Sequence, residues 1–360
     1  MNSNKIVHKL INCCNNRINQ NLDRIFDKND KIDIFDYRRI LNDKTSFSYS
    51  RNTNNFYGLD STLKRYSGYK KGIYVATEHG VQIPKAENFL CVSEYKNNYS
   101  SVLLTCAAKR AKSLLAYSDK LIIPIGPYIQ YAESIYDDEI IAQIKSNLGR
   151  TLLIFPQHSC EMGFAKCENK GFIEFVKKIK HEYSFDTVIV CIYFYDFIQG
   201  LHIPYEREGW TIVSAGHRQN IHFLDNLKTF ITIADHTIFQ AYSSSVGYAL
   251  AMEKPVLAYP YRHKFTKKSR EYQEALLDRN ENVTYDIQLG EDIYIELFSN
   301  YHSTITNEQL KWAEECISLS IKKTPEEMKD IFKMARELYW DFGGHKEKII
   351  RKYGYDNLES

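Results

Sequence analysis

The sequence predicts an α/β protein of two Rossmann-like halves that face a central cleft, with helices closing the chain. Apolar runs of strand length alternate with amphipathic helical stretches in two successive series, which favours mostly parallel sheets. The chain has 360 residues, enough for two domains that each bury a core. Polar residues and glycines gather where the expected strands end, and open parallel sheets bind ligands at that edge.

The first half, expected to span residues 1–148, contains three apolar runs typical of strands. They lie within 72–80, 88–95 and 120–129, and a helical pattern over 100–119 separates the last two. The other elements expected here are one or two helices within 1–30, a strand over 31–37 and a short helix over 61–68 that ends at a glycine.

The second half, expected to span 149–324, repeats the alternation after a helix over 137–150. Its expected elements are strands over 151–159, 187–195, 210–218, 237–240 and 256–259, and helices over 171–183, 220–234 and 246–252. Charged amphipathic helices over 307–323 and 325–352 end the chain, and the segment at about 325–360 is free to pack back on the first half.

Composition limits the classes of function. A net charge of +2 with 44% hydrophobic residues is typical of a globular protein rather than of a basic nucleic-acid binder. Basic clusters such as 264–270 are solvated faces or sites for anionic lipid or substrate, and the sequence leaves that choice open. The eight cysteines include no CxxC pair, which favours reduced thiols. With no signal-peptide pattern and no apolar run of about 20 residues, we expect a cytoplasmic protein whose contact with the inner membrane, if any, is peripheral.

A serine-rich turn between an expected strand and an expected helix is the stretch most typical of a ligand site. Ser243, Ser244 and Ser245 precede the helix that contains Gly247. The first amides of a helix have no internal partner and favour anions, so this turn can hold a phosphate or a carboxylate. A serine at such a position can equally serve as an ordinary N-cap.

Four further polar motifs stand at strand ends in both halves. They are Glu78-His79-Gly80, Gly126-Pro127, His158-Ser159 and Gly216-His217-Arg218. No GxGxxG follows the first strand, and no GxxxxGK followed by Ser or Thr occurs. The sequence therefore argues against an NAD enzyme and against a P-loop NTPase.

Six pieces of the chain, in order over about residues 55–260, resemble bacterial GT-B glycosyltransferases that build surface polysaccharide, lipopolysaccharide or capsule. They are YGLDSTLKRYSG (57–68), TEHG (77–80), IGPYIQYAE (125–133), LLIFPQHS (152–159), GWTIVSAGHR (209–218) and SSSVGYALAMEKPV (243–256). The resemblance implies a GT-B architecture with an acceptor-side first domain and a nucleotide-sugar-binding second domain. It also implies transfer from a nucleotide sugar, with no cofactor.

A narrower likeness is to the sialyl- and Kdo-type transferases, which use CMP-activated acidic sugars. It implies a base at Glu78 and CMP contacts from His158 and from the serine-rich turn. Two positions depart from that pattern, because His79 replaces a second acidic residue and Ser159 replaces a proline. The first expectation is an inverting transfer of a CMP-activated acidic sugar to a glycan or lipid-linked glycan, and a UDP- or GDP-sugar donor is the alternative.

Inverting transfer needs a base for the acceptor hydroxyl and stabilisation of the departing phosphate. Glu78 is the first candidate base, against the alternative of a loop glutamate with no role. His79 is the second, since imidazole exchanges protons near neutral pH. His158 is expected to bond the donor phosphate or to protonate the leaving oxygen, unless it bonds a neighbouring backbone group.

The remaining expected site residues have less defined roles. Ser159, Gly216, His217 and Gly247 are expected donor contacts, and Arg218 either grips a phosphate or forms a surface salt bridge. On the acceptor side, Tyr128 and Tyr131 either line the cleft or pack in the core. No DxD motif lies in a loop suited to a metal, since Asp137-Asp138-Glu139 is typical of a helix start, so we expect no divalent metal ion.

Two other functions fit the same architecture. A UDP-sugar epimerase would form product from a free nucleotide sugar without an acceptor. A non-catalytic binding protein would have no enzymatic activity, so a Glu78→Ala substitution would leave every measured activity unchanged.

Overall fold

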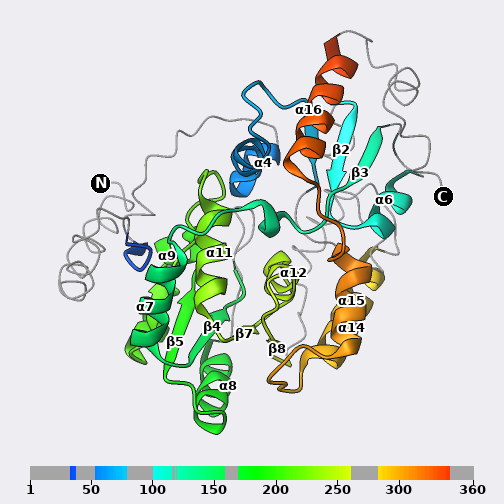
Figure 1. Ribbon diagram of the computed structural model, residues 1–360. Coiled ribbons are helices and arrows are strands. Elements are labelled where there is room, and N and C mark those ends of the chain that lie inside the picture. The colour runs from blue at the N-terminus through cyan, green and yellow to red at the C-terminus, as the bar shows by residue number, and fades with distance from the viewer. Residues whose placement is uncertain are drawn as a thin grey trace, which may run out of the picture.

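The computed structural model describes residues 33–37, 53–78, 100–115, 118, 120–158, 169–260 and 283–340. Within them the chain forms two parallel β-sheets with helices packed around them, and further helices follow toward the C-terminal end (Figure 1). The predicted class, an α/β protein with two Rossmann-like units and closing helices, is confirmed by this arrangement.

The larger sheet has five parallel strands in the order β6-β5-β4-β7-β8. Their bounds are β4 Thr151–Phe155, β5 Thr187–Cys191, β6 Thr211–Val213, β7 His236–Phe239 and β8 Val256–Ala258. The chain runs outward from β4 through β5 to β6 and then returns to the other side of β4. Strand order therefore reverses between β4 and β7, which is the topological switch point of a doubly wound sheet. Leu153 in the middle of β4 pairs with Ile189 on one side and with Thr237 on the other.

The smaller sheet has three parallel strands in chain order, β1 Val75–Thr77, β2 Val102–Thr105 and β3 Leu121–Pro124. The residues of β1 and β2 are all buried. Short continuous apolar runs of this kind are typical of parallel strands that are covered on both faces. Helix α6 Ala108–Leu115 connects β2 to β3.

The remaining helices cover the sheets and end the chain (Figure 1). They are η1 Thr53–Gly58, α4 Leu59–Ser67, η2 Tyr128–Tyr131, α7 Asp138–Leu148, α8 Asn169–Glu182, α9 Phe194–Ile198, α10 Ile203–Arg207, α11 Phe223–Ile233, α12 Ser244–Ala251, α14 Val283–Phe298, α15 Asn307–Ile317 and α16 Pro325–Trp340.

Local sequence explains both ends of α7. Asp137 is its N-cap and accepts a hydrogen bond from the Ile140 amide at 3.0 Å. Gly149 ends the helix at φ 65°, and a Cβ there would lie 2.5 Å from Asp186 Oδ2. Glycine is therefore required at the helix end by both the backbone angle and the space.

One of the hydrophobic clusters formed by the described residues joins the two sheets. It contains Leu104 and Ile123 of the smaller sheet together with Leu153 and Phe239 of the larger one. Helix α16 returns to the first half, where it lies against α4 and beside the smaller sheet (Figure 1). The two halves are thus packed against each other over apolar surface.

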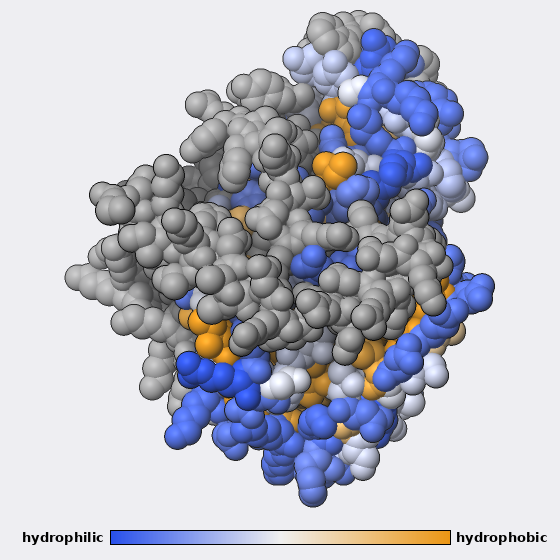
Figure 2. All heavy atoms as spheres, turned by 90° about the vertical axis from the view of Figure 1, so that its left-hand side faces the viewer, coloured by the Kyte–Doolittle hydropathy of each residue, from blue (hydrophilic) through white to orange (hydrophobic). Residues whose placement is uncertain are grey.

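The face seen in Figure 2 is largely hydrophilic over the described residues, with smaller hydrophobic patches between the charged side chains. None of the helices in the described ranges is long and apolar enough to cross a bilayer.

Some expected elements differ from the structure or lie outside it. The segment 100–119 is not one helix, because β2 and α6 divide it. Val102–Thr105 bonds to strands on both sides, and this sheet pairing overrides the helical spacing of its apolar residues. A turn replaces the strand expected over 31–37 in the part described. The helices expected within 1–30 and the strand expected over 88–95 lie outside the described residues.

Candidate functional site

A pocket of about 430 Å³ opens at the carboxyl edge of the larger sheet. Its described lining comes from the segments that follow β4, β5, β6 and β7, from α11 and α12, and from η1. The pocket therefore lies across the switch point between β4 and β7, where doubly wound sheets bind their ligands.

The two loops at the switch point are held to each other. Phe155 and Phe239, the last residues of β4 and β7, stack with ring centroids 4.5 Å apart. The Gln157 amide donates a hydrogen bond to Gln240 Oε1 at 2.9 Å. These contacts fix the base of the pocket before any ligand arrives.

The serine-rich turn forms one wall. Ser243 is the N-cap residue of α12 with an extended backbone, and its side chain makes no capping hydrogen bond. All three serines are half-buried and line the pocket. The structure therefore does not bear out the N-cap alternative for the Ser243 hydroxyl, and it places that hydroxyl at the amino end of α12 beside the cavity.

Aromatic residues and a thiol form much of the remaining wall, among them Tyr193, Tyr242, Tyr248 and Cys191. Burial raises the pKa of Tyr242 and of Tyr248 far above the usual range. Burial also raises the pKa of Cys191 to about 12. These groups keep their protons at neutral pH, so Cys191 does not supply a nucleophilic thiolate there.

His158 lies at the pocket with an exposed side chain. Its ring is 5.3 Å from the ring of Tyr193, which follows β5. Among the described lining residues, His158 is therefore the histidine that shares the cavity with the serine-rich turn.

The Gly216-His217-Arg218 motif divides between two surroundings. Gly216 lines the pocket at φ 97°, a conformation that favours glycine, and its amide bonds Ser214 Oγ at 3.1 Å. His217 is 4% exposed and does not line the pocket. Its Nδ1 accepts from the Gln219 amide at 3.2 Å, which leaves Nε2 to donate to Tyr195 Oη at 3.3 Å.

Arg218 contacts two residues of the first half. Its guanidinium lies 4.3 Å from the centre of the Phe56 ring, and its carbonyl accepts a hydrogen bond from the Tyr57 amide. Arg218 is not among the residues that line the pocket. In this conformation the guanidinium makes a cation–π contact with η1 and does not line the pocket.

Glu78 lies at the carboxyl end of β1 but does not line the pocket. Its carboxylate accepts from Thr105 Oγ1 at 2.5 Å and from Arg110 Nε at 2.7 Å, and Arg110 Nη2 lies 2.6 Å away. The two charged side chains are 5% and 7% exposed. The expectation of a base that faces the cleft is corrected here, because the carboxylate is buried and already bound.

The two tyrosines expected on the acceptor side are core residues. Tyr128 is 0% exposed and donates to the carbonyl oxygen of Glu78 at 3.0 Å. Tyr131 is 2% exposed and donates to the carbonyl oxygen of Ile125. The sequence left two alternatives for these tyrosines, lining the cleft or packing in the core, and the structure favours packing in the core.

Three expected site residues remain, and the structure describes one of them. Gly247 is buried inside α12 and does not line the pocket. His79 and Ser159 lie outside the described residues. Within the described ranges, no three His, Cys, Asp or Glu side chains are grouped closely enough to hold a metal ion.

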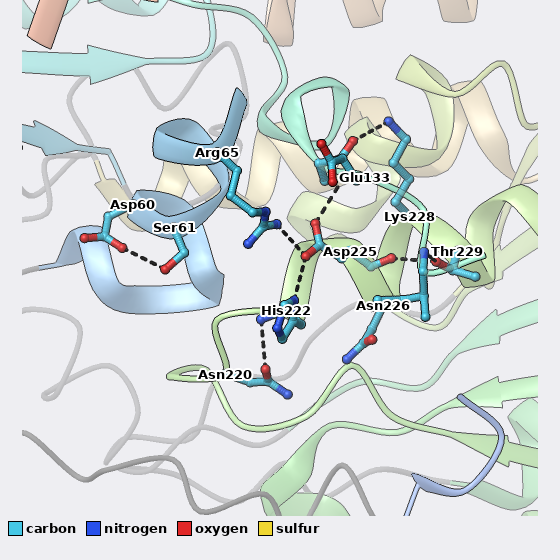
Figure 3. A network of polar contacts seen from close by, with 12 residues as sticks. Asp60, Ser61, Arg65, Glu133, Asn220, His222, Asp225, Asn226, Lys228 and Thr229 are labelled. Atoms are coloured by element: carbon cyan, nitrogen blue, oxygen red, sulfur yellow. Dashed lines mark hydrogen bonds and ion pairs between the residues drawn. The ribbon is translucent and has the colours of Figure 1, made fainter. Parts of the chain in front are cut away.

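A polar network at the start of α11 connects the pocket to the first half (Figure 3). Asp225 Oδ2 accepts from Arg65 Nη2 of α4 at 2.5 Å and lies 3.0 Å from His222 Nδ1. Asp225 Oδ1 accepts from the Glu133 amide, after η2, at 3.2 Å. Because Phe223 and Leu224 on the same helix line the pocket, this carboxylate positions one of its walls.

Sequence reasoning missed the aromatic lining. Tyr57, Tyr193, Tyr242 and Phe223 all line the pocket, and none was expected there. Tyr242 follows the strand expected over 237–240, and Tyr193 lies near the end of the strand expected over 187–195, so position near a strand end is an available signal. The sequence gives no comparable signal for Tyr57, which comes from the other half of the chain.

Neither a protein-family model nor a curated protein matches the chain. Among solved structures, it is similar to that of the wall teichoic acid polymerase TagF, with 13% sequence identity and a TM-score of 0.40. The similarity covers 77% of this chain and 70% of that chain. At this level it establishes no family, and function is argued below from the site.

Proposed function

We propose that this chain is a glycosyltransferase of bacterial surface-polysaccharide synthesis that takes its sugar from a nucleotide-sugar donor. The observation that carries the proposal is the pocket at the switch point, with Ser243–Ser245 and the amino end of α12 on its wall. Nucleotide ligands bind at such edges with phosphate against a helix N-terminus. The ordered motifs shared with GT-B glycosyltransferases support this reaction over others at the same edge.

The serine-rich turn would hold the phosphate of the donor. Negative charge grows on that phosphate as the bond to the sugar breaks, and helix amides aimed at it stabilise the charge without rearrangement. The hydroxyls of the three serines add donors at the same place. Helix dipole and hydroxyls together would serve where other transferases use a metal ion, so metal-independent transfer remains our proposal.

We assign the proton transfer to His158. In an inverting transfer, the acceptor oxygen bonds the anomeric carbon as that carbon's bond to phosphate breaks, and the acceptor proton passes to a base. Glu78 is bound by Arg110 and Thr105, whereas the exposed His158 lies at the pocket. His79 stays the second candidate, and Glu78 could act only after exchanging its partners.

The donor is proposed first as a CMP-activated acidic sugar and alternatively as a UDP- or GDP-sugar. The acceptor is proposed as a glycan or lipid-linked glycan, with peripheral contact at the cytoplasmic face of the inner membrane. Both assignments rest on the motif resemblance.

Thermal shift with CMP, UDP, GDP and dTDP tests nucleotide binding. A nucleotide at 100 times its Kd stabilises the native state by about 2.7 kcal/mol, which raises Tm by several degrees. A selective CMP response supports the acidic-sugar donor, and a selective UDP or GDP response supports the alternative. If no nucleotide shifts Tm, the proposed function is wrong.

Turnover with the responding donor tests the proton transfer. His158→Ala should lower kcat at least a hundredfold, while His181→Ala, which alters an exposed histidine on α8, should leave it unchanged. Equal activity of the two variants would remove His158 from the mechanism. Product formed without acceptor would point to an epimerase instead.

A further inference from the structure

A turn in the first half has a strained backbone where it meets the pocket. Tyr57, near the end of η1, has φ 58° and ψ 21°, in the left-handed region that bulky residues seldom adopt. Gly58 follows at φ 67°, and a Cβ there would lie 2.4 Å from the carbonyl oxygen of Ile221. Two successive left-handed residues thus turn the chain tightly against the loop before α11.

Contacts from the second half hold this turn in place. The Tyr57 amide donates to the carbonyl oxygen of Arg218, and the Tyr57 ring meets Phe223 edge-on with centroids 4.9 Å apart. The neighbouring Phe56 ring lies under the Arg218 guanidinium. The strained conformation is therefore fixed by packing between the halves.

Tyr57 lines the pocket, and every other described lining residue belongs to the second half. Backbone strain persists only where the surroundings over-determine it, and it concentrates at ligand sites. Here the strained residue is also the one that carries an aromatic ring from one half into the cavity of the other.

We propose that Tyr57 is a specificity residue that contacts the sugar ring of the donor, an inference that rests on the proposed function. A tyrosine offers an apolar face and a hydroxyl together, which matches the alternating C–H and O–H groups of a sugar. Tyr193 and Tyr242 give the cavity more surface of the same chemistry. Because Tyr57 belongs to the first half, the pocket is complete only while the two halves are docked.

The test compares affinity for a nucleotide sugar with affinity for the same nucleotide without its sugar. Three ligand pairs serve as probes: CMP and CMP-N-acetylneuraminic acid, UDP and UDP-N-acetylglucosamine, and GDP and GDP-mannose. Tyr57→Asn removes the ring but tolerates the left-handed backbone. Tyr57→Phe removes the hydroxyl alone, and Tyr339→Asn makes the matched ring removal at an exposed position on α16, outside the lining.

Tyr57→Asn should weaken binding of the nucleotide sugar at least tenfold and change binding of the bare nucleotide less than threefold. Tyr57→Phe should give an intermediate loss, and Tyr339→Asn should leave the ratio of the two affinities at its wild-type value. An unchanged ratio in Tyr57→Asn overturns the inference, as does a wild-type ratio of about one. A wild-type protein that binds neither ligand of any pair overturns the proposed function itself, and the inference falls with it.

Discussion

Replacing Arg110 with methionine removes one half of a buried ion pair and leaves the other half in place. The Glu78 carboxylate is 5% exposed and has two contacts with the guanidinium, at 2.6 and 2.7 Å, and one with Thr105 at 2.5 Å. In the variant, the carboxylate would keep the Thr105 bond only. Breaking a buried pair in this way costs about 3–5 kcal/mol, because a charge stays out of water without its partner.

A double-mutant cycle separates the ion pair from its surroundings. Glu78→Gln alone removes the negative charge opposite the buried guanidinium and should cost a similar amount. The double variant Glu78→Gln/Arg110→Met removes both charges and keeps an oxygen for Thr105, so its loss should be about 1 kcal/mol. The two single losses would then exceed the double loss by about 5 kcal/mol or more, a coupling larger than the roughly 0.5–3 kcal/mol of typical neighbouring residues.

Urea unfolding followed by circular dichroism measures these free energies. Lys333→Met is a matched control, because it breaks an ion pair with Asp330 in which both side chains are about half exposed, and no measurable change is expected. Single losses under about 1 kcal/mol, or losses that simply add in the double variant, would refute the reasoning. Abolished turnover in Glu78→Gln at unchanged stability would restore Glu78 as the base.

Three further predictions concern other parts of the fold. Burial lowers the pKa of His236 to about 4. As pH falls below about 6.5, the unfolded chain therefore binds a proton here before the folded chain does. The free energy of unfolding should drop by up to about 3 kcal/mol between pH 6.5 and pH 4. Asp225→Asn weakens the contact with Arg65 and should lower the free energy of unfolding by about 1–3 kcal/mol. Gly216→Ala should cost about 1–2 kcal/mol and weaken nucleotide binding, because its φ is 97° at the pocket.

Each of these has its own check. In His236→Gln, the free energy of unfolding measured by urea titration should no longer fall as pH drops from 6.5 to 4. An unaltered fall would assign the effect to other groups. For Asp225→Asn, Arg65→Met should add little further loss, and full additivity would contradict the shared contact. For Gly216→Ala, calorimetry with the responding nucleotide decides, and unchanged affinity would remove Gly216 from the site.

The alternation of elements and several of their ends could be predicted because local patterns set them. Asp137 and Gly149 mark the two ends of α7 in the sequence as in the structure. The apolar run at 151–155 and the serine-rich turn likewise follow from period and from small polar residues. Since the carboxyl ends of parallel strands share an edge, the sequence could also place His158 near that turn.

The remaining features depend on contacts between distant parts of the chain. Glu78 stands at a strand end, as a catalytic carboxylate would, but Arg110 lies 32 positions later and removes it from the solvent. Tyr128 follows Gly126-Pro127 at a strand end, yet its hydroxyl donates to the carbonyl oxygen of Glu78, 50 positions earlier. Tyr57 enters the pocket through the packing of one half on the other. Sequence patterns over a few neighbouring residues cannot predict contacts between residues this far apart in the chain.

The Ser243→Asp substitution tests most directly whether the serine-rich turn holds the donor phosphate. Aspartate is a preferred N-cap and its charge stabilises a helix N-terminus, so α12 should be at least as stable as before. A carboxylate about 4 Å from the phosphate would oppose binding by up to about 4 kcal/mol. Ser243→Asn is the matched neutral control.

Calorimetric titration of both variants with the responding nucleotide gives the result. We expect Ser243→Asp to keep its Tm and lose at least tenfold in affinity, while Ser243→Asn stays within about threefold of the wild type. If Ser243→Asp binds the nucleotide as tightly as Ser243→Asn does, the turn is an ordinary helix start and the phosphate lies elsewhere.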